Sequence, residues 1–535
     1  MEELRTFTIQ LNEKICTEGF YKESMDHLFT CRQFENLLLI LLKENYERFK
    51  EGKDTNDFRY LTNAFLMQNV LFDYDGKAKN EKKYITEKYS QYPIFQELLK
   101  SAKAVGHNNA PSLISRVKNT YTSYFELLKA YEKKELTEKP NPPQPKKLSK
   151  IVNYAIDLNN AHSVSLCRLE NMSVFGINLN SEMKYIIINP EIIDGLNLTK
   201  KKIKSAKLVY SNGYLYLQTG YYKEINETTS LTKKDAGLDI GIKNSISCFV
   251  DDNKTPSLLI NGGDLQSYNN KFNNELSALQ TELTTKEVKE WGASKTGTKY
   301  PKTYTENGIK IKEEISVMFE ERNKYFKDQF HKISKGMLEY LHINKVTDLY
   351  ISNTLAELKN NGKCKLKTRV KRDFIQIPFL SLFEIFKYKA KEYNISIHFV
   401  DEAYTSKTSC ITANINKVQE LNKNLTNNHT PSEPVPLIRV EGKEGNIYKG
   451  KRTQRGLFKD TILNKVWNAD LNGAVNILKV GTKITKTSFE WLKNALWKLS
   501  NPIKCSVCEL HNIYAIASTG LRYRTQRNQS LIMSV

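Results

Sequence analysis

Residues 236–253 read AGLDIGIKNSISCFVDDN, and this stretch decides the fold. Apolar and small residues on both sides of Lys243 and Asn244 predict two short strands joined by a turn. Asp239 lies inside the first of these strands, where a charged side chain is costly unless it is paired or bound to a metal ion. Asp239 is therefore the first candidate site residue.

Helical and strand patterns alternate after this hairpin. Apolar residues three and four apart mark the helices, and short apolar runs bounded by polar residues mark the strands. The predicted elements are helices at 271–287 and 313–341, a strand at 346–352, a helix at 377–393, a strand at 395–400 and a helix at 467–480.

Two further acidic positions stand at the ends of predicted elements. The strand 395–400 leads into Asp401 and Glu402, and Asp470 opens a helix rich in small residues. Carboxylates that converge from separate elements of an α/β sheet suit two hard divalent cations, which catalyse phosphodiester hydrolysis. Singly, each acid also fits a lysine pair, a turn or a helix N-terminus. Together, and in this order of elements, they favour an RNase-H-like nuclease core.

The net charge indicates a polyanionic partner. The chain has 535 residues with 81 Lys and Arg against 59 Asp and Glu, a formal charge of +22. Nucleic acid is the simplest such partner, although a merely soluble basic protein shows the same excess. The most apolar run, LLLILL at 37–42, is too short to span a bilayer, so no membrane association is expected.

Cysteine usage predicts a reducing interior and no structural zinc. The eight cysteines are scattered and form no disulfide framework. Cys505 and Cys508 form a CxxC with His511 three residues on, but a structural zinc site needs four ligands, usually from two such pairs. This motif is interpreted as chance or as a weak half-site.

The N-terminal part has a different organisation. Residues 3–11 predict a strand, and 22–135 are patterned as helices. A Pro-rich linker follows at 138–150. Residues 151–226 are strand-like and contain a hairpin signal, Ser-Asn-Gly, at 211–213. We expect a small β-barrel there.

Several segments resemble the RuvC-type nuclease of the TnpB and Fanzor families, which are transposon-encoded, RNA-guided DNA endonucleases related to the type V CRISPR effectors. The segments are GLDIGIKN, FIQIPFLSLFEIFKYKA, DEAYTSKTS, GKRTQRGLF at 450–458 and NADLNGAVNIL. The resemblance covers about 235–480 well. Upstream, only the order and size of the elements are similar to the wedge and recognition domains of that family.

This resemblance implies a multidomain fold: a RuvC (RNase-H-like α/β) nuclease domain with an α-helical recognition domain and a small β-barrel wedge domain. The implied boundaries are 1–21 for the first strand or strands of the wedge barrel, 22–138 for the recognition domain, 139–234 for the rest of the wedge, 235–480 for the nuclease with a degenerate zinc-ribbon region at 410–465, and 481–535 for a C-terminal tail.

The resemblance also implies the catalytic and metal-binding residues. Asp239 matches the first RuvC acid and Asp470 the third. Most relatives carry the second acid, a glutamate, after the strand corresponding to 346–352, where this chain has Ser352 and Asn353.

A subset of TnpB proteins and the Fanzors carry the second acid elsewhere, in the segment before YTSK, and Glu402 fits that pattern. Glu357 is the fallback. Because side chains alternate along a strand, only one of Asp401 and Glu402 is expected to point into the site. The expected cofactors are two Mg²⁺ ions, with no structural zinc.

The partners implied by the resemblance are a guide RNA and target double-stranded DNA with a short flanking motif. The candidate nucleic-acid-binding residues, each equally compatible with a solvated surface, are Lys365, Lys367, Arg369, Lys371, Arg372, Lys451, Arg452 and Arg455. The expected location is intracellular: the nucleus for a eukaryotic or viral host, the cytoplasm or nucleoid for a bacterial one. The sequence points to no protein partner.

Two other functions stay open. The displaced second acid is compatible with a catalytically silent RNA-guided DNA-binding protein. A DDE-type DNA transposase shares the RNase-H-like core, so acids alone do not exclude it. The segments GKRTQRGLF and YTSKTS favour the endonuclease.

Overall fold

The structure is a computed structural model that divides into two compact units, Met1–Glu224 and Ile225–Val535. Each unit is described by itself. The structure describes all residues except 1, 13, 17, 75–77, 108, 147–152, 159–163, 170–171, 180–181, 189–202, 212, 225–232, 242, 294–296, 353–375, 421–446, 455, 484–490 and 513–535.

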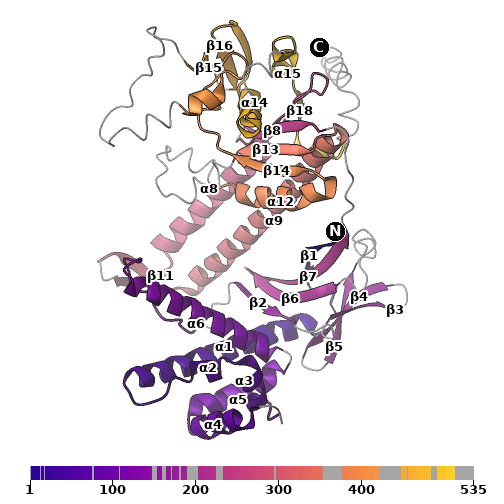
Figure 1. The fold of residues 1–535 in the computed structure, drawn as a ribbon. Helices are drawn as coiled ribbons and strands as arrows, with labels where there is room; N and C mark the ends of the chain where they lie inside the picture. Colours follow the sequence, from indigo (N-terminus) through magenta and orange to yellow (C-terminus); the bar gives the residue numbers. More distant parts are fainter. Residues whose placement is uncertain are drawn as a thin grey trace. The chain divides into compact units, whose positions relative to one another are not determined.

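The first unit combines a helical block with antiparallel strands (Figure 1). The described helices are α1 (Phe20–Lys50), α2 (Phe58–Leu61), α3 (Ala64–Leu71), α4 (Lys79–Tyr89), α5 (Pro93–Val105) and α6 (Ala110–Glu132). The described strands are β1 (Glu2–Leu11), β2 (Asn153–Asp157), β3 (Val164–Leu169), β4 (Met172–Leu179), β5 (Glu182–Ile188), β6 (Ile203–Ser211) and β7 (Tyr214–Glu224).

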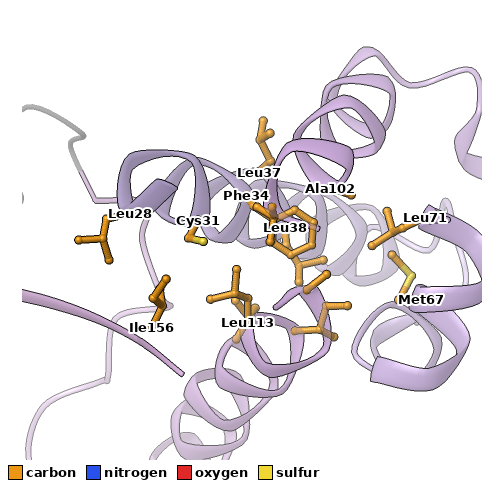
Figure 2. Packing of buried hydrophobic residues seen from close by; sticks show 14 of the residues in the cluster. Leu28, Cys31, Phe34, Leu37, Leu38, Met67, Leu71, Ala102, Leu113 and Ile156 are labelled. Atoms are coloured by element: carbon orange, nitrogen blue, oxygen red, sulfur yellow. The ribbon is translucent and has the colours of Figure 1, made fainter. Parts of the chain in front are cut away.

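Apolar stripes of the helices and one face of the strands share a single core in this unit. Leu38 of α1, Leu113 of α6 and Ile156 of β2 belong to the same buried cluster. Figure 2 shows these side chains converging, with Met67 of α3 and Ala102 of α5. The helical pattern at 22–135 thus forms a packed block, as the spacing of apolar residues predicts.

The described strands of the first unit form two antiparallel sheets, one of four strands in the order β1-β7-β6-β2 and one of three in the order β3-β4-β5. β1 pairs with β7 over its whole length, so the N-terminal strand joins strands from beyond the linker. The predicted Ser-Asn-Gly turn lies between β6 and β7. Closure of these sheets into a barrel stays a prediction.

The second unit is built around a mixed sheet with helices on both faces. Its described helices are α8 (Gly263–Thr285), α9 (Glu306–Ile343), α12 (Phe379–Ala390), α14 (Ala469–Thr482) and α15 (Trp497–Ser500), with short 3-10 helices η4 (Lys391–Tyr393) and η6 (Val507–Asn512). Its described strands are β8 (Asp235–Asp239), β9 (Asn244–Val250), β10 (Leu258–Asn261), β11 (Val288–Ala293), β12 (Lys299–Tyr304), β13 (Asp348–Ser352), β14 (Ser396–Val400), β15 (Gly450–Gln454), β16 (Leu457–Asp460), β17 (Lys465–Asn468) and β18 (Ile503–Cys505).

Described strands of this unit form a six-stranded sheet in the order β14-β13-β8-β9-β10-β18. β8, β9 and β10 make an antiparallel meander, as the sequence of the first hairpin predicts. β13 runs parallel to both β8 and β14. The carboxyl ends of β8, β13 and β14 therefore lie at one edge of the sheet.

Alternation along the strands assigns each face of this sheet to different helices. Leu238 of β8 packs in a cluster with Phe330 of α9 and Phe386 of α12. The neighbouring position, Gly237, faces α14: a Cβ added there would lie 2.1 Å from the carbonyl oxygen of Ala474. Because successive side chains point to opposite faces, Asp239 is on the α14 side as well.

Some elements differ from the sequence-based expectation. The stretch between α8 and α9, for which the sequence analysis predicts no strand, contains the hairpin β11–β12. Residues before α14 form a three-stranded sheet, β15-β16-β17. Part of the segment treated as a tail pairs as β18 alongside β10. Polar and lysine-rich strands give little apolar alternation, so these elements carry a weak sequence signal.

Arg322 is a charged residue buried on the apolar face of α9. It lies three residues after Phe319 and four before Phe326, so it shares their side of the helix, and it is only 8% exposed. Its guanidinium donates to Asn269 Oδ1 at 2.9 Å and lies over the rings of Phe272 and Phe326. It therefore joins α9 to α8 inside the unit. No helix in the described part of the chain has the length and apolar character needed to cross a membrane.

Candidate active site

Three acidic side chains meet on the α14 face of the six-stranded sheet. Asp239 is the last residue of β8, Glu402 lies two residues after β14, and Asp470 is the second residue of α14. β8 and β14 flank β13, with their carboxyl ends at the same edge. Parallel pairing and the position of α14 thus bring together residues that are far apart in the sequence.

Electrostatics confirm that the three carboxylates share one environment. Burial raises the pKa of Asp239 well above its usual range, and the carboxylates of Glu402 and Asp470 raise this pKa further. The guanidinium of Arg452 opposes the shift. Like charges act on each other in this way only at short range, so Asp239 is the acid around which the site is organised.

Small residues let α14 approach Asp239 closely. A Cβ added at Gly473 would lie 2.7 Å from Asp239 Oδ2, a distance that real Cβ atoms essentially never show. Gly237 is equally close to α14 on the strand side. The small-residue helix predicted from the sequence is therefore what allows the first and third acids to face each other.

Asp470 is held from both sides. Asn468 caps α14, accepting hydrogen bonds from the backbone N–H groups of Asp470 and Leu471 at 2.9 Å each. Arg452 of β15 donates to Asp470 Oδ1 at 3.0 Å, and Asn244 of β9 donates to Asp470 Oδ2 at 2.8 Å. Both carboxylate oxygens thus have a fixed partner.

The structure separates the two neighbouring acids after β14. Asp401 is exposed, and its Oδ1 accepts a hydrogen bond from the backbone N–H of Ala403 at 2.9 Å, as in a turn. Glu402 is partly buried and acts on Asp239. Glu402, rather than Asp401, is therefore the acid on the Asp239 side.

The donor set fits hard divalent cations. Carboxylate oxygens are the ligands that Mg²⁺ and Ca²⁺ take, and a bound cation would relieve the repulsion that raises the pKa of Asp239. Within the described residues, no three His, Cys, Asp or Glu side chains are already gathered around one point as metal ligands. To bind an ion, the three carboxylates would have to move closer together. Arg452 would also have to release Asp470 Oδ1.

The remaining predicted residues have varied positions. Lys451 is exposed on β15, whereas its neighbour Arg452 contacts Asp470. Ser352 is buried at the end of β13. Cys505 is buried in β18 and Cys508 is exposed. Outside the described residues lie Asn353, Glu357, Lys365, Lys367, Arg369, Lys371, Arg372 and Arg455.

Asn244 was missed as a site residue by the sequence analysis, and the contact between Arg452 and Asp470 was not predicted. Asn244 was seen only as part of a turn, although a polar side chain next to an acid-bearing strand was a usable signal. Arg452 was expected to contact nucleic acid, and the structure places it on Asp470. Arg452 and Asp470 are 18 residues apart, and Arg452 lies in a sheet that the sequence does not predict. Their contact could therefore not be predicted from the sequence.

Comparisons with known proteins identify the same region. Residues 218–357 match the family model described as a probable transposase, OrfB of IS605. Residues 379–477 match the model of the Cas12f1-like TNB domain. The first match contains Asp239, and the second contains Glu402 and Asp470. No curated protein matches the chain significantly.

Solved structures with a similar arrangement include the protein of a Cas12f1–sgRNA–target DNA complex, at 13% identity and a TM-score of 0.42, covering 89% of this chain and 98% of that one. A CRISPR–Cas12f ternary complex matches at 15% identity and a TM-score of 0.30, covering 86% and 81%. The two family models show that the region that carries the three acids is similar to TnpB-like transposase-associated proteins and to the type V effector Cas12f1.

Proposed function

We propose that this chain is an RNA-guided DNA endonuclease that hydrolyses phosphodiester bonds with divalent metal ions held by Asp239, Glu402 and Asp470. The observation that carries the proposal is the convergence of three carboxylates from β8, the turn after β14 and α14, with Glu402 and Asp470 both acting on the buried Asp239. A buried acid next to two further acids is costly to the fold, and such strongly perturbed groups cluster at functional sites.

The sheet supports an RNase-H-like nuclease core. An antiparallel meander β10-β9-β8 continues into the parallel strands β13 and β14, with the acids at the carboxyl edge of β8 and β14. The match to a transposase family model and the charge of +22 are consistent with an enzyme acting on nucleic acid. The Cas12f1 complex named above contains sgRNA and target DNA, the classes of partner that we propose here.

Each site residue has a role in this proposal. Asp239, Glu402 and Asp470 would hold Mg²⁺, which supplies an activated water and stabilises the attacking and leaving oxygens. Asn244 keeps Asp470 oriented through its hydrogen bond to Oδ2. Arg452 neutralises part of the carboxylate charge before metal arrives and, once displaced, presents a guanidinium to a phosphate.

A plasmid-cleavage assay tests this function. The chain is co-expressed with the RNA transcribed from its flanking genomic sequence, and wild type is compared with Asp239→Ala, Glu402→Ala and Glu357→Ala in Mg²⁺. We expect wild type and Glu357→Ala to cut and the other two variants not to cut. If Glu357→Ala is the inactive variant instead, the enzyme class stands and the position of the second acid is wrong.

A second candidate is a guided DNA-binding protein without nuclease activity. Two observations favour it: Ser352 stands at the end of β13, and Arg452 occupies Asp470 Oδ1. Guided binding of target DNA by wild type, with no cleavage at any Mg²⁺ or Mn²⁺ concentration, would support this alternative and contradict the endonuclease.

A further inference from the structure

Glu402 differs from the other two acids in the secondary structure that carries it. Asp239 lies in a strand and Asp470 in a capped helix, but Glu402 belongs to the turn that follows β14. In that turn Tyr404 has a φ of 65°, a left-handed conformation that a bulky residue adopts only when its surroundings enforce it. The contacts that enforce this turn therefore decide where Glu402 points.

A row of polar side chains on α14 makes those contacts. Asn472, Asn476 and Lys479 are spaced by four and three residues, so they share one face of the helix, and all three are buried. The face is directed at backbone groups of residues 405–410, as the hydrogen bonds below show. We call these three residues the α14 clamp.

The hydrogen bonds of the clamp reach Glu402 through Thr405. Asn476 Nδ2 donates to the carbonyl oxygens of Thr405 at 2.8 Å and Thr408 at 2.7 Å. Thr405 in turn donates to the carbonyl oxygen of Glu402 from its N–H at 3.0 Å and from its Oγ1 at 2.8 Å. Two steps thus connect α14 to the backbone of the second acid.

The other clamp residues fix the far end of the turn. Asn472 donates to Thr408 O at 2.8 Å, and its Oδ1 accepts from the Cys410 N–H at 3.0 Å. Lys479 Nζ donates to the carbonyl oxygen of Cys410. Such buried donors are costly when unpaired, so the turn and the helix hold each other in one arrangement.

We propose that Asn472, Asn476 and Lys479 are positioning residues that set Glu402 for metal binding, so that the helix carrying the third acid also places the second. This inference rests on the proposed function, because it assumes that Glu402 binds metal. Glu402 lies in a turn rather than in a strand or helix, so other contacts must hold it in a fixed orientation for metal binding. The α14 clamp supplies those contacts.

The test compares Asn476→Ala with wild type in the full chain, using Mn²⁺ as the probe. Its two readouts are hydrogen exchange of the amides of residues 403–410 and Mn²⁺ affinity from electron paramagnetic resonance. We expect faster exchange in this segment and an affinity about 10- to 100-fold weaker, the usual effect of losing a residue that orients a metal ligand. In the cleavage assay, higher Mn²⁺ should partly restore the rate.

Tyr340→Phe is the matched control. The Tyr340 hydroxyl is buried and donates to the carbonyl oxygen of Pro256, so this variant also loses a buried side-chain hydrogen bond to the backbone. Tyr340 belongs to the cluster on the other face of the sheet. We expect Tyr340→Phe to leave both exchange in 403–410 and Mn²⁺ affinity unchanged.

The possible outcomes separate the two proposals. Faster exchange with unchanged Mn²⁺ affinity in Asn476→Ala would overturn the positioning role. If the wild type binds Mn²⁺ and Asn476→Ala shows both expected changes, but the wild type never cuts DNA, the nuclease proposal is wrong. The positioning role of the α14 clamp is then still supported. If Asn476→Ala does not fold, Lys479→Met, which keeps an unbranched side chain, takes its place with the same expectations.

Discussion

The strand β8 carries an aspartate at each end, and the two ends differ in the cations that accompany their acids. Near Asp235, Lys234 Nζ donates to Asp252 Oδ2 at 2.7 Å, and His398 Nε2 lies 2.8 Å from Asp348 Oδ1. Near Asp239, three carboxylates share the guanidinium of Arg452. We refer to these as the paired end and the catalytic end.

The pKa shifts reflect this difference. Burial alone would raise the pKa of Asp252, but hydrogen bonds from Lys234 and Thr255 hold it below its usual range. At the catalytic end, burial and two further carboxylates both raise the pKa of Asp239. Asp252 therefore stabilises the fold, although burial raises the pKa of Asp235 and Asp251 at the same end. Asp239 opposes folding, as expected of an acid in the metal site proposed above.

The largest expected effect tests the catalytic end with two neighbouring acids. Glu402→Gln removes a charge that acts on Asp239, and Asp401→Asn removes one from an exposed turn. We expect cleavage to slow about 100- to 1,000-fold in the first variant, the scale for losing one group that stabilises the transition state, and to change less than about threefold in the second. Initial cleavage rates at saturating guide RNA measure both. Equal rates in the two variants would contradict the assignment of Glu402.

The next effect tests the paired end. Lys498 is 0% exposed; its Nζ donates to the carbonyl oxygen of Val250 at 2.8 Å and lies 3.6 Å from Asp252 Oδ1. Burial lowers the pKa of Lys498 to about 8, and Asp252 opposes this shift. Lys498→Met should lower the free energy of unfolding by about 3 kcal/mol, because the buried carbonyl oxygens of Val250 and Asp252 lose a donor and Asp252 loses one of its two cations.

Denaturant unfolding measures this loss, with Lys504→Met as the control. Lys504 is exposed on the adjacent strand β18, so its substitution should change stability by less than about 0.5 kcal/mol. If the two substitutions cost the same, the cation at the paired end does not stabilise the fold, and the contrast between the ends fails.

Asp239 and Asp252 should contribute to the pH dependence of stability with opposite signs when no divalent ion is present. The folded chain keeps the Asp239 proton at pH values where the unfolded chain has released it, so stability falls as pH rises above about 4. Asp239→Asn should remove this loss and raise Tm near neutral pH, by about 1–2 °C for each ~1 kcal/mol relieved in a unit that spans residues 225–535. This variant would thus be more stable and inactive.

Asp252 should show the reverse. Its lowered pKa contributes stability that is present above about pH 4 and is lost as pH falls through the folded value. Asp252→Asn should therefore lower Tm at neutral pH and flatten the acid limb of the profile. Calorimetry from about pH 2 to pH 8 in a chelating buffer measures both variants. If both substitutions changed the pH dependence of Tm in the same direction, the contrast between Asp239 and Asp252 would be wrong.

Much of the catalytic end was predictable from the sequence because its signals are local. An aspartate inside an apolar strand stands out at Asp239, and the small residues around Gly473 indicate a helix that packs closely. The order of strands and helices then predicts that parallel strands end together. These patterns depend on periods of two and 3.6 residues, which are legible without a structure.

The supports of the site were not predictable, because burial contradicts the pattern. Asn472, Asn476 and Lys479 form a polar stripe that normally marks a solvent-exposed face, yet all three are buried against backbone carbonyls. Hydrogen bonds to a carbonyl leave no mark on the sequence of the partner, so buried polar contacts appear only once the fold is known.

The smallest effect concerns Arg452, the cation that opposes the pKa shift of Asp239. Its side chain is 49% exposed, and an ion pair so accessible to water contributes about 0–1 kcal/mol. Arg452→Gln should therefore lower the free energy of unfolding by less than about 1 kcal/mol without metal, and 0.5 M salt or saturating Mg²⁺ should remove the difference. Thermal denaturation in the three conditions measures this. A loss as large as that of Lys498→Met would show that Arg452 is a structural cation and that both ends of β8 are paired.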